Sequence, residues 1–272
     1  MNDLHKEIRE ALQNGDIPIK KLTNKSIGNS IVFKNSSKTE YCKPILKEER
    51  CILIIDIVGF SKNEMEEQLL IYETLNKLLK DSESQIKSIY SDWKKYNIFK
   101  GTGDGGIFIF GQGRNPISVR DALIFAIYTM KTVIKYNNAL PQDAINSFKL
   151  RMALSYDEIF MTEDLENNTD IIGDAINITA RLASIKEAKS NSIFISSEIY
   201  HTLQINKDHF YFNINSDKSI PASGELSDFI VGKKPDANNF LYIVRKGSFE
   251  TKDRTLEAFN ISGRIDGVDI IT

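Results

Sequence analysis

Runs of apolar positions along the chain predict an alternation of strands and helices. Residues 51–55 (Cys-Ile-Leu-Ile-Ile) are continuously apolar, which is typical of a strand buried on both faces. Between residues 65 and 89, and again between 119 and 134, apolar side chains recur at helical spacings. Two amphipathic helices are therefore expected, the second starting near Pro116 and Ser118, which suit a helix start.

Further strands are expected between and after these helices. Residues 96–111 form apolar arms around a glycine-rich turn, the pattern of a hairpin, and residues 148–156 alternate strictly. A third helix is predicted after residues 170–173, running to about Lys189, and the apolar runs 193–196 and 240–244 predict additional strands. The order β-α-β-β-α-β, with additions, predicts an α+β fold of the ferredoxin-like palm type.

The same pattern divides the chain into three parts. Residues 1–47 form an N-terminal extension with a short amphipathic helix on Leu4, Ile8 and Leu12; residues 48–247 form the main domain; residues 248–272 form a polar C-terminal tail. Two interpretations of the extension stay open, a flexible tail and a segment that regulates the protein or supports a dimer.

Composition narrows the class of protein. The 272 residues are 41% hydrophobic and 26% charged, which is ordinary for a globular chain. Lys and Arg number 35 against 37 Asp and Glu, and this balance argues against nucleic acid as a partner. The longest apolar run, residues 51–60, contains Asp56 and is too short to span a membrane, and the charged N-terminus is no secretory signal. A cytoplasmic protein is expected, with Cys42 and Cys51 as reduced thiols and no zinc spacing among the histidines.

Two acidic residues carry the first chemical signal. Asp56 ends the apolar strand, and Asp104 lies in the glycine-rich turn of the neighbouring hairpin. A strand-end carboxylate is costly unless it is paired or bound to metal, and two converging carboxylates repel each other. A divalent cation removes that repulsion, and Mg²⁺ completes its shell with phosphate oxygens and water. Each residue alone also fits a simple cap or turn, so the pair together predicts the metal site.

A third motif lies at the start of the third predicted helix. Asn177 and Arg181 are four residues apart and therefore share one helix face. Asparagine is suited to orienting a ribose or phosphate, and arginine to neutralising charge on a phosphoryl group. Taken alone, the pair is better explained as a solvated helix face, with Arg181 in a surface ion pair.

Together these motifs resemble those of class III nucleotidyl cyclases, the adenylyl and guanylyl cyclase catalytic domains. The resemblance covers about residues 48–247 and rests on three ordered motifs: Asp-Ile-Val-Gly-Phe-Ser at 56–61, Lys-Gly-Thr-Gly-Asp at 100–104, and Asp-Ile-Ile-Gly-x-x-Ile-Asn-x-x-x-Arg at 170–181. It implies a head-to-tail homodimer whose two sites each combine residues of both subunits.

The resemblance also implies a role for each matched residue. Asp56 and Asp104 correspond to the residues that bind two divalent cations, Mg²⁺ or Mn²⁺, with the Ile57 carbonyl as a further ligand. Asn177 and Arg181 correspond to the residues that position the ribose and stabilise the transition state, and Lys100 and Asp170 to those that read the base. Substrate contacts are further expected from Gly59, Phe60 and Ser61, whose glycine lets the backbone approach a polyphosphate.

The chain departs from the family pattern in two places. The strand that begins at Arg151 continues Met-Ala-Leu-Ser-Tyr-Asp-Glu and lacks the glycines that usually follow it. The phosphate-binding lysine that usually precedes a glycine is missing near Gly232, and Lys233 or Lys234 is the expected substitute.

The implied reaction converts a nucleoside triphosphate into a 3′,5′-cyclic nucleotide and pyrophosphate. Lysine donates and ionised aspartate accepts, so Lys100 and Asp170 complement the acceptor–donor edge of adenine, which cytosine shares. ATP is favoured, and a pyrimidine cyclase of the Pycsar antiphage type, making cyclic CMP or cyclic UMP, is the alternative. An inactive cyclase-fold module for binding or dimerisation is the alternative of another class. The effector that would receive the product is unknown.

Overall fold

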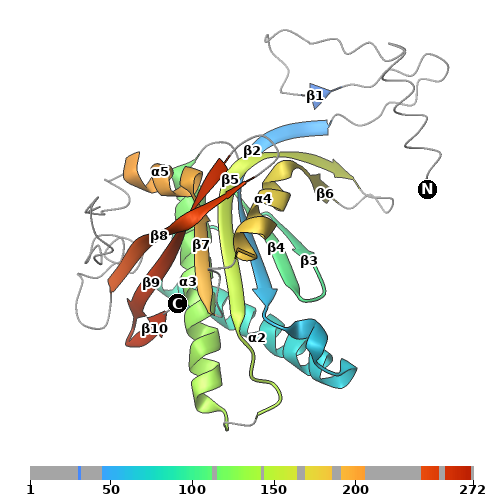
Figure 1. Ribbon diagram of the computed structural model, residues 1–272, viewed down its shortest axis with the longest axis vertical. Helices are drawn as coiled ribbons and strands as arrows, with labels where there is room; N and C mark the ends of the chain where they lie inside the picture. Colours follow the sequence, from blue (N-terminus) through green and yellow to red (C-terminus); the bar gives the residue numbers. More distant parts are fainter. Residues whose placement is uncertain are drawn as a thin grey trace, which may run out of the picture. The chain divides into compact units, whose positions relative to one another are not determined.

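The structure is a computed structural model that describes residues 30–31, 45–111, 115–141, 144–163, 169–185, 191–205, 240–250 and 255–270 (Figure 1). The chain divides into two compact units. The larger unit comprises residues 49–158 and 174–272, and the smaller unit comprises residues 1–48 and 159–173. The predicted helix on Leu4, Ile8 and Leu12, together with Cys42, lies outside the described residues.

The larger unit is built on a β-α-β-β-α-β core. In chain order its elements are β2 (Ile45–Ile57), the short helix η1 (Phe60–Lys62), α2 (Met65–Ile89), β3 (Ile98–Gly101), β4 (Gly105–Phe110), α3 (Pro116–Ala139) and β5 (Leu150–Glu163). The strands lie side by side in the order β5-β2-β4-β3, and β4 is antiparallel to both β2 and β3. This is the ferredoxin-like arrangement, so the predicted fold class is confirmed.

Two helices and four strands of the larger unit follow β5 in the chain, and the strands extend the sheet. In chain order they are α4 (Asp174–Ala183), β7 (Ser192–Ser196), α5 (Ser197–Ile205), β8 (Phe240–Glu250), β9 (Thr255–Ile265) and β10 (Val268–Ile270). β7 runs parallel to β5, and β9 pairs antiparallel with β7, β8 and β10. The sheet therefore continues from β5 through β7 and β9 to β10.

The smaller unit consists of short pairings. β1 (Ser30–Ile31) pairs with the first residues of β2, Ile45 and Leu46. β6 (Thr169–Ile172) pairs antiparallel with the last residues of β5, from Phe160 to Glu163.

Strand alternation separates the two faces of the sheet in the larger unit. On one face, α2 and α3 bury a large apolar cluster with alternate residues of β2, among them Leu53 and Ile55. On the other face, Leu182 and Ala183 of α4 pack with Ala153 of β5 and with residues of β7 and β9. Figure 1 shows α3 behind the sheet and α4 in front of it. Polar side chains that alternate with the buried ones therefore lie beneath α4.

Two expectations about element ends are wrong. α4 ends at Ala183, before Lys189, with Ser184 bonded to the carbonyls of the last turn. Residues 255–270, expected in a polar tail, form β9 and β10, and β9 is almost wholly buried. The expectation of a tail rested on the polar residues of this segment, whose hydrogen bonds are made inside the protein. Asn260 donates to the Ile193 carbonyl at 3.2 Å and accepts from Ser262 at 2.7 Å.

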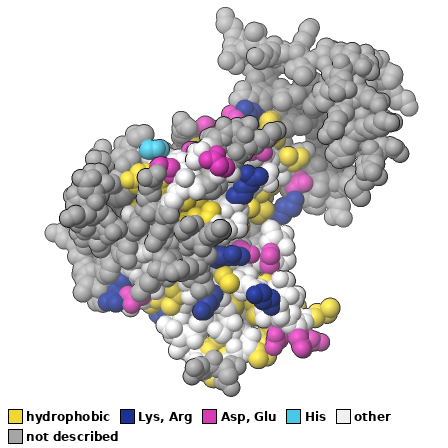
Figure 2. Space-filling view, viewed as in Figure 1, with side chains coloured by type: hydrophobic (Ala, Val, Ile, Leu, Met, Phe, Trp, Pro, Cys, Tyr) yellow, Lys and Arg dark blue, Asp and Glu magenta, His cyan; other side chains and the backbone are white. Residues whose placement is uncertain are grey.

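The described surface agrees with the balanced charge of the chain. Lys and Arg side chains are interspersed with Asp and Glu side chains on the face drawn in Figure 2. Among the described residues, no helix has the length and apolar character needed to cross a membrane.

Candidate functional site

The sheet register brings Asp56 and Asp104 together. Asp56, near the end of β2, lies opposite Gly105, and the Ile57 amide donates to the Asp104 carbonyl at 2.8 Å. This close pairing depends on Gly105, because a Cβ there would lie 1.9 Å from the Ile55 carbonyl oxygen. The two acidic residues that the sequence singles out are therefore neighbours at one edge of the hairpin.

Arg151 balances the charge of Asp56. Its guanidinium donates from Nε at 2.9 Å and from Nη2 at 2.5 Å to the same oxygen, Oδ2 of Asp56. Burial raises the pKa of Asp56, Arg151 opposes that rise, and the nearby Asp104 carboxylate adds to it. Asp56 is thus a half-buried carboxylate for which a cation is electrostatically favourable.

A pocket of about 250 Å³ opens over these groups. Its polar wall is formed by Asp56, Thr102, Asp104 and Arg151, and the Thr102 hydroxyl donates to Oδ1 of Asp104 at 3.0 Å. The remaining wall is formed by strand residues Ile54, Ile55 and Ile107 and by α4 residues Ile176, Ala180, Ala183 and Ser184. The carboxylates and the arginine therefore lie under one face of α4.

Asn177 and Arg181 lie on a different face of α4. Both are exposed, and neither lines the pocket. The Arg181 guanidinium donates to the Glu250 carbonyl at 3.4 Å, on the neighbouring strand β8. Within one chain, neither side chain contributes to the described lining of the pocket at Asp56 and Asp104.

The other predicted residues occupy varied positions. Gly59 has a φ of 74° before η1, Phe60 packs partly buried against the core, and Ser61 is exposed. Lys100 is exposed on β3. Asp170 belongs to β6 of the smaller unit, where its carboxylate accepts from the Ile171 amide at 2.8 Å.

Two further expectations concern substrate contacts. Lys233 and Lys234 lie outside the described residues. Phe60 is absent from the described lining of the pocket at Asp56.

The described donors fit a divalent cation only in part. No group of three or more His, Cys, Asp or Glu side chains gathers anywhere in the described part of the chain. Asp56 and Asp104 do supply two carboxylates, which is the number Mg²⁺ commonly takes when substrate phosphates and water complete its shell. The residues present therefore fit a cation that arrives with a phosphorylated substrate.

Arg151 is the charged group in the described lining of this pocket that the motifs did not single out. Arg151 is a charged residue in a strand whose next five residues, Met152 to Tyr156, are buried. Such a position signals a paired or functional charge, because an unpaired charge beside a buried strand is costly. Its partner, 95 residues earlier in the chain, is set by the sheet.

Comparison with known structures places the fold. The adenylyl cyclase CyaB from P. aeruginosa is similar over 82% of this chain and 98% of its own, with 17% identity and a TM-score of 0.51. The chain has the fold of adenylyl and guanylyl cyclase catalytic domains. The dimeric guanylyl cyclase domain of the RhoGC fusion protein from Blastocladiella emersonii matches 80% of this chain and 98% of its own, at 19% identity and a TM-score of 0.51.

A nucleotide complex is also among the similar structures. The guanylate cyclase domain of RhGC from Catenaria anguillulae, in complex with GTP, covers 80% of this chain and 98% of its own, with 18% identity and a TM-score of 0.51. No protein-family model matches the chain, and no curated protein matches it by sequence. The predicted class III cyclase resemblance is thus confirmed at the level of the fold.

Proposed function

We propose that the protein is a nucleotidyl cyclase, a lyase that converts a nucleoside triphosphate into a 3′,5′-cyclic nucleotide and pyrophosphate. One observation carries the proposal: Asp56 and Asp104 meet in one pocket of a cyclase fold, with the Arg151 guanidinium beside them. Two carboxylates and a cation at one point suit a polyphosphate that arrives with divalent metal.

The proposed metal residues are Asp56 and Asp104, with the Ile57 carbonyl as a further ligand. Bound Mg²⁺ or Mn²⁺ would lower the pKa of the ribose 3′-hydroxyl and neutralise the phosphates. Thr102 orients the Asp104 carboxylate through its 3.0 Å hydrogen bond. Arg151 lies within the same pocket, where its guanidinium is available to phosphate oxygens once it releases Asp56.

The remaining groups act on the sugar and on the developing charge. Asn177 holds the ribose, and Arg181 stabilises negative charge on the phosphoryl oxygens as the 3′-oxygen attacks the α-phosphorus. Because both side chains lie outside the pocket of their own chain, we propose that they act in the pocket of a second copy. The protein then works as a head-to-tail homodimer with two equivalent sites.

Base selection is assigned to Lys100 and Asp170. Lys100 donates to the N1 acceptor of adenine, and the Asp170 carboxylate accepts from the N6 amine. Guanine and uracil present the opposite order and leave buried polar groups unpaired. ATP is the proposed substrate, and CTP is its rival because cytosine repeats the adenine pattern on a smaller ring. The similar structures include complexes with GTP and with ATPαS, so the fold alone does not select the base.

The decisive experiment supplies each of the four nucleoside triphosphates with Mn²⁺ and identifies the products by mass. We expect cyclic AMP as the main product, with GTP and UTP disfavoured about ten- to a hundred-fold for each mispaired buried group. Cyclic CMP as the main product would support the Pycsar-type alternative instead. No cyclic product from any of the four would favour the inactive binding module and overturn the proposal.

A double variant and a control variant test whether Lys100 and Asp170 select the base. Lys100→Glu combined with Asp170→Cys is expected to weaken the preference for ATP over GTP, because the donor and the acceptor are both lost. Lys80→Gln, an exposed lysine on α2, is the control and keeps the wild-type preference. Dominant wild-type use of GTP or UTP would show that Lys100 and Asp170 do not read the base.

A further inference from the structure

A second pocket, of about 350 Å³, lies at the start of α3. Its described lining comes from three segments: Lys94, Lys95 and Asn97 after α2; Phe110 and Gly111 at the end of β4; and Asn115, Ile117, Ser118 and Asp121 of α3 and its cap. It shares no described residue with the pocket at Asp56. Asp104 precedes β4 and Phe110 ends it, so the two pockets lie at opposite ends of that strand.

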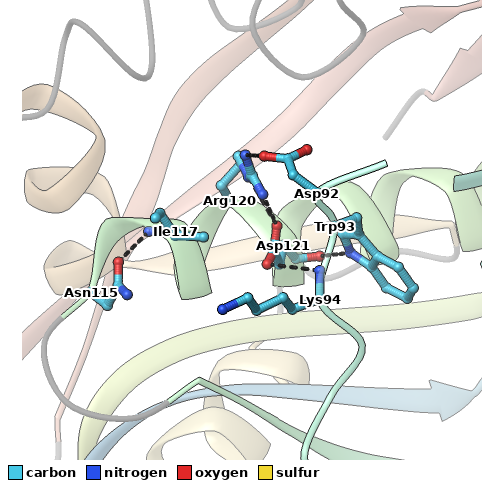
Figure 3. Close-up of polar contacts among 7 residues, drawn as sticks. All are labelled: Asp92, Trp93, Lys94, Asn115, Ile117, Arg120 and Asp121. Carbon is cyan, nitrogen blue, oxygen red and sulfur yellow. Dashed lines mark hydrogen bonds and ion pairs between the residues drawn. The ribbon is translucent and has the colours of Figure 1, made fainter. Parts of the chain in front are cut away.

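The wall of this pocket is held by a network around Asp121, drawn in Figure 3. The buried Asp121 carboxylate accepts from Arg120 Nη2 at 2.7 Å and from the Lys94 amide at 3.1 Å. The indole of Trp93 donates to the Asp121 carbonyl at 3.0 Å, and Arg120 also reaches Asp92 at 2.6 Å. Asp121 therefore shares the Arg120 guanidinium with Asp92, and its bond to the Lys94 amide fixes the segment that carries Lys94 to α3.

One buried hydroxyl of the wall has no partner in this network. Ser118 is only 5% exposed and lines the pocket, and its hydroxyl makes no hydrogen bond to any other residue that the structure describes. Gly111, at φ +67°, makes room for it, since a Cβ there would lie 1.6 Å from Ser118 Oγ. The Ser118 oxygen remains accessible from the pocket and can donate to an acceptor that binds there.

Lys94 supplies the unpaired positive charge of the described lining, in which the Asp121 carboxylate is paired with Arg120. The Lys94 side chain forms no ion pair with a described residue, while the Lys95 ammonium is shared with Glu83 at 2.9 Å. The N-terminal end of α3, a helix of 24 residues, adds positive partial charge. The Asn115 side chain already accepts from the Ile117 amide at 2.9 Å, so a ligand is held by side chains rather than by free helix amides.

We propose that this pocket binds the phosphate group of a small phosphorylated molecule, separately from the nucleotide site. Lys94 and Ser118 are the main donors, and Asn97 and Lys95 also line the pocket. Donors from separate segments match the several acceptor oxygens of a phosphate better than the two coplanar oxygens of a carboxylate. The volume is in the range of small-molecule sites, and Phe110 and Ile117 offer apolar contact to the remainder of the ligand.

Trp93 provides a direct readout of the pocket. It is the only tryptophan of the chain, it is buried against Phe125, and it precedes Lys94. We would titrate the full chain with inorganic phosphate at constant ionic strength, without divalent metal, and follow tryptophan fluorescence. A saturable change is expected in the wild type. Lys94→Gln and Ser118→Ala should each weaken phosphate binding about ten-fold or more, because each removes a donor to a charged group.

Two control variants separate this pocket from other anion sites. Lys80→Gln removes an exposed lysine elsewhere and should leave the titration unchanged. Arg151→Gln removes the arginine of the pocket at Asp56 and should also leave it unchanged. Thermal unfolding of each variant checks that the fold is retained.

The proposal is overturned by any of three results. These are a fluorescence change that rises linearly without saturation, a saturable change that persists in both Lys94→Gln and Ser118→Ala, and one that disappears only in Arg151→Gln. Because no nucleotide turnover is measured, failure here is distinct from failure of the proposed cyclase activity.

Discussion

At the scale of single residues, three effects of its surroundings shift the pKa of Asp56. Burial raises its pKa, the Arg151 guanidinium lowers it, and the Asp104 carboxylate raises it. For a carboxyl whose folded pKa is raised, the contribution to stability is present at low pH and is lost as pH rises through the folded pKa. Ionisation of Asp56, which metal binding needs, therefore lowers the stability of the fold, so function and stability oppose each other at this residue.

The first prediction concerns Arg151. Arg151→Gln removes the cation that lowers the pKa of Asp56, so this pKa should rise further and the acid limb of metal binding should move to higher pH. Carbon-13 NMR of the aspartate carboxyls across pH measures the change. Arg181→Gln, which removes an arginine outside the pocket, should leave the titration of Asp56 in place. An unchanged or lower pKa in Arg151→Gln would contradict the assignment.

The second prediction concerns the two carboxylates themselves. Asp56→Ala and Asp104→Ala should each abolish turnover and weaken Mn²⁺ binding, while the melting temperature stays within a few degrees of wild type, because neither residue belongs to the apolar core. Electron paramagnetic resonance of Mn²⁺ and product assays provide the measurements. Asp81→Ala, an exposed aspartate on α2, is the control. More than a few per cent of residual activity in either active-site variant would remove the two-metal assignment.

At the scale of elements, the pairing of β2 with β4 builds the site. The hairpin places Asp104 beside Ile57 only because Gly105 allows the strands to approach. The third prediction follows: Gly105→Ala should lower the free energy of unfolding by about 1–3 kcal/mol or more, since its Cβ overlaps the Ile55 carbonyl.

Urea denaturation of two matched variants measures this effect. Gly101→Ala is the control, because a Cβ there meets nothing closer than the Tyr72 hydroxyl at 3.5 Å. Its free energy of unfolding should stay within about 0.5 kcal/mol of wild type. Equal losses in the two variants would show that close approach at Gly105 is not what limits the pairing.

The side chains of α4 lie in three different environments. Ile178 and Leu182 are buried, Ile176 and Ala180 line the pocket, and Asn177 and Arg181 are exposed. The spacing of Asn177 and Arg181 predicts that they share a face, as they do. It does not predict that the neighbouring face of the same helix covers Asp56 and Asp104 of the same chain.

At the scale of the whole molecule, the proposed site is completed by a second copy. The fourth prediction is that Asp104→Ala mixed with Arg181→Ala regains activity, although each variant alone is inactive. Mixed dimers rebuild one site from two intact halves, so recovery of up to roughly a quarter of wild-type activity is expected from random assembly. The assay is product formation after demonstrated subunit exchange.

The control for this experiment is a mixture of Asp56→Ala with Asp104→Ala. Both residues belong to the pocket of one chain, so no mixed dimer restores an intact set. Equal recovery in both mixtures, or exchange without recovery in the first, would refute the head-to-tail arrangement.

Local periodicity was sufficient for most of the elements and for the central acidic pair. The apolar run before Asp56, the hairpin around Asp104 and the stripe of α3 each express a contact pattern that recurs within a few residues. The β-α-β-β-α-β order then implies neighbouring strands, and hence the meeting of Asp56 with the hairpin turn. The prediction of a metal pair therefore follows from nearby sequence plus topology.

Other features of the structure depend on contacts between distant segments, which local sequence patterns do not predict. The ion pair of Arg151 with Asp56 and the place of β9 beside β7 both join segments that are distant in the sequence. The sequence of β9 looks polar because it contains residues such as Asn260 and Ser262. These two can be buried in the sheet because Ser262 donates a hydrogen bond to Asn260. Periodicity reports which side of an element is buried, whereas the identity of the group across from it depends on contacts that form only in the folded chain.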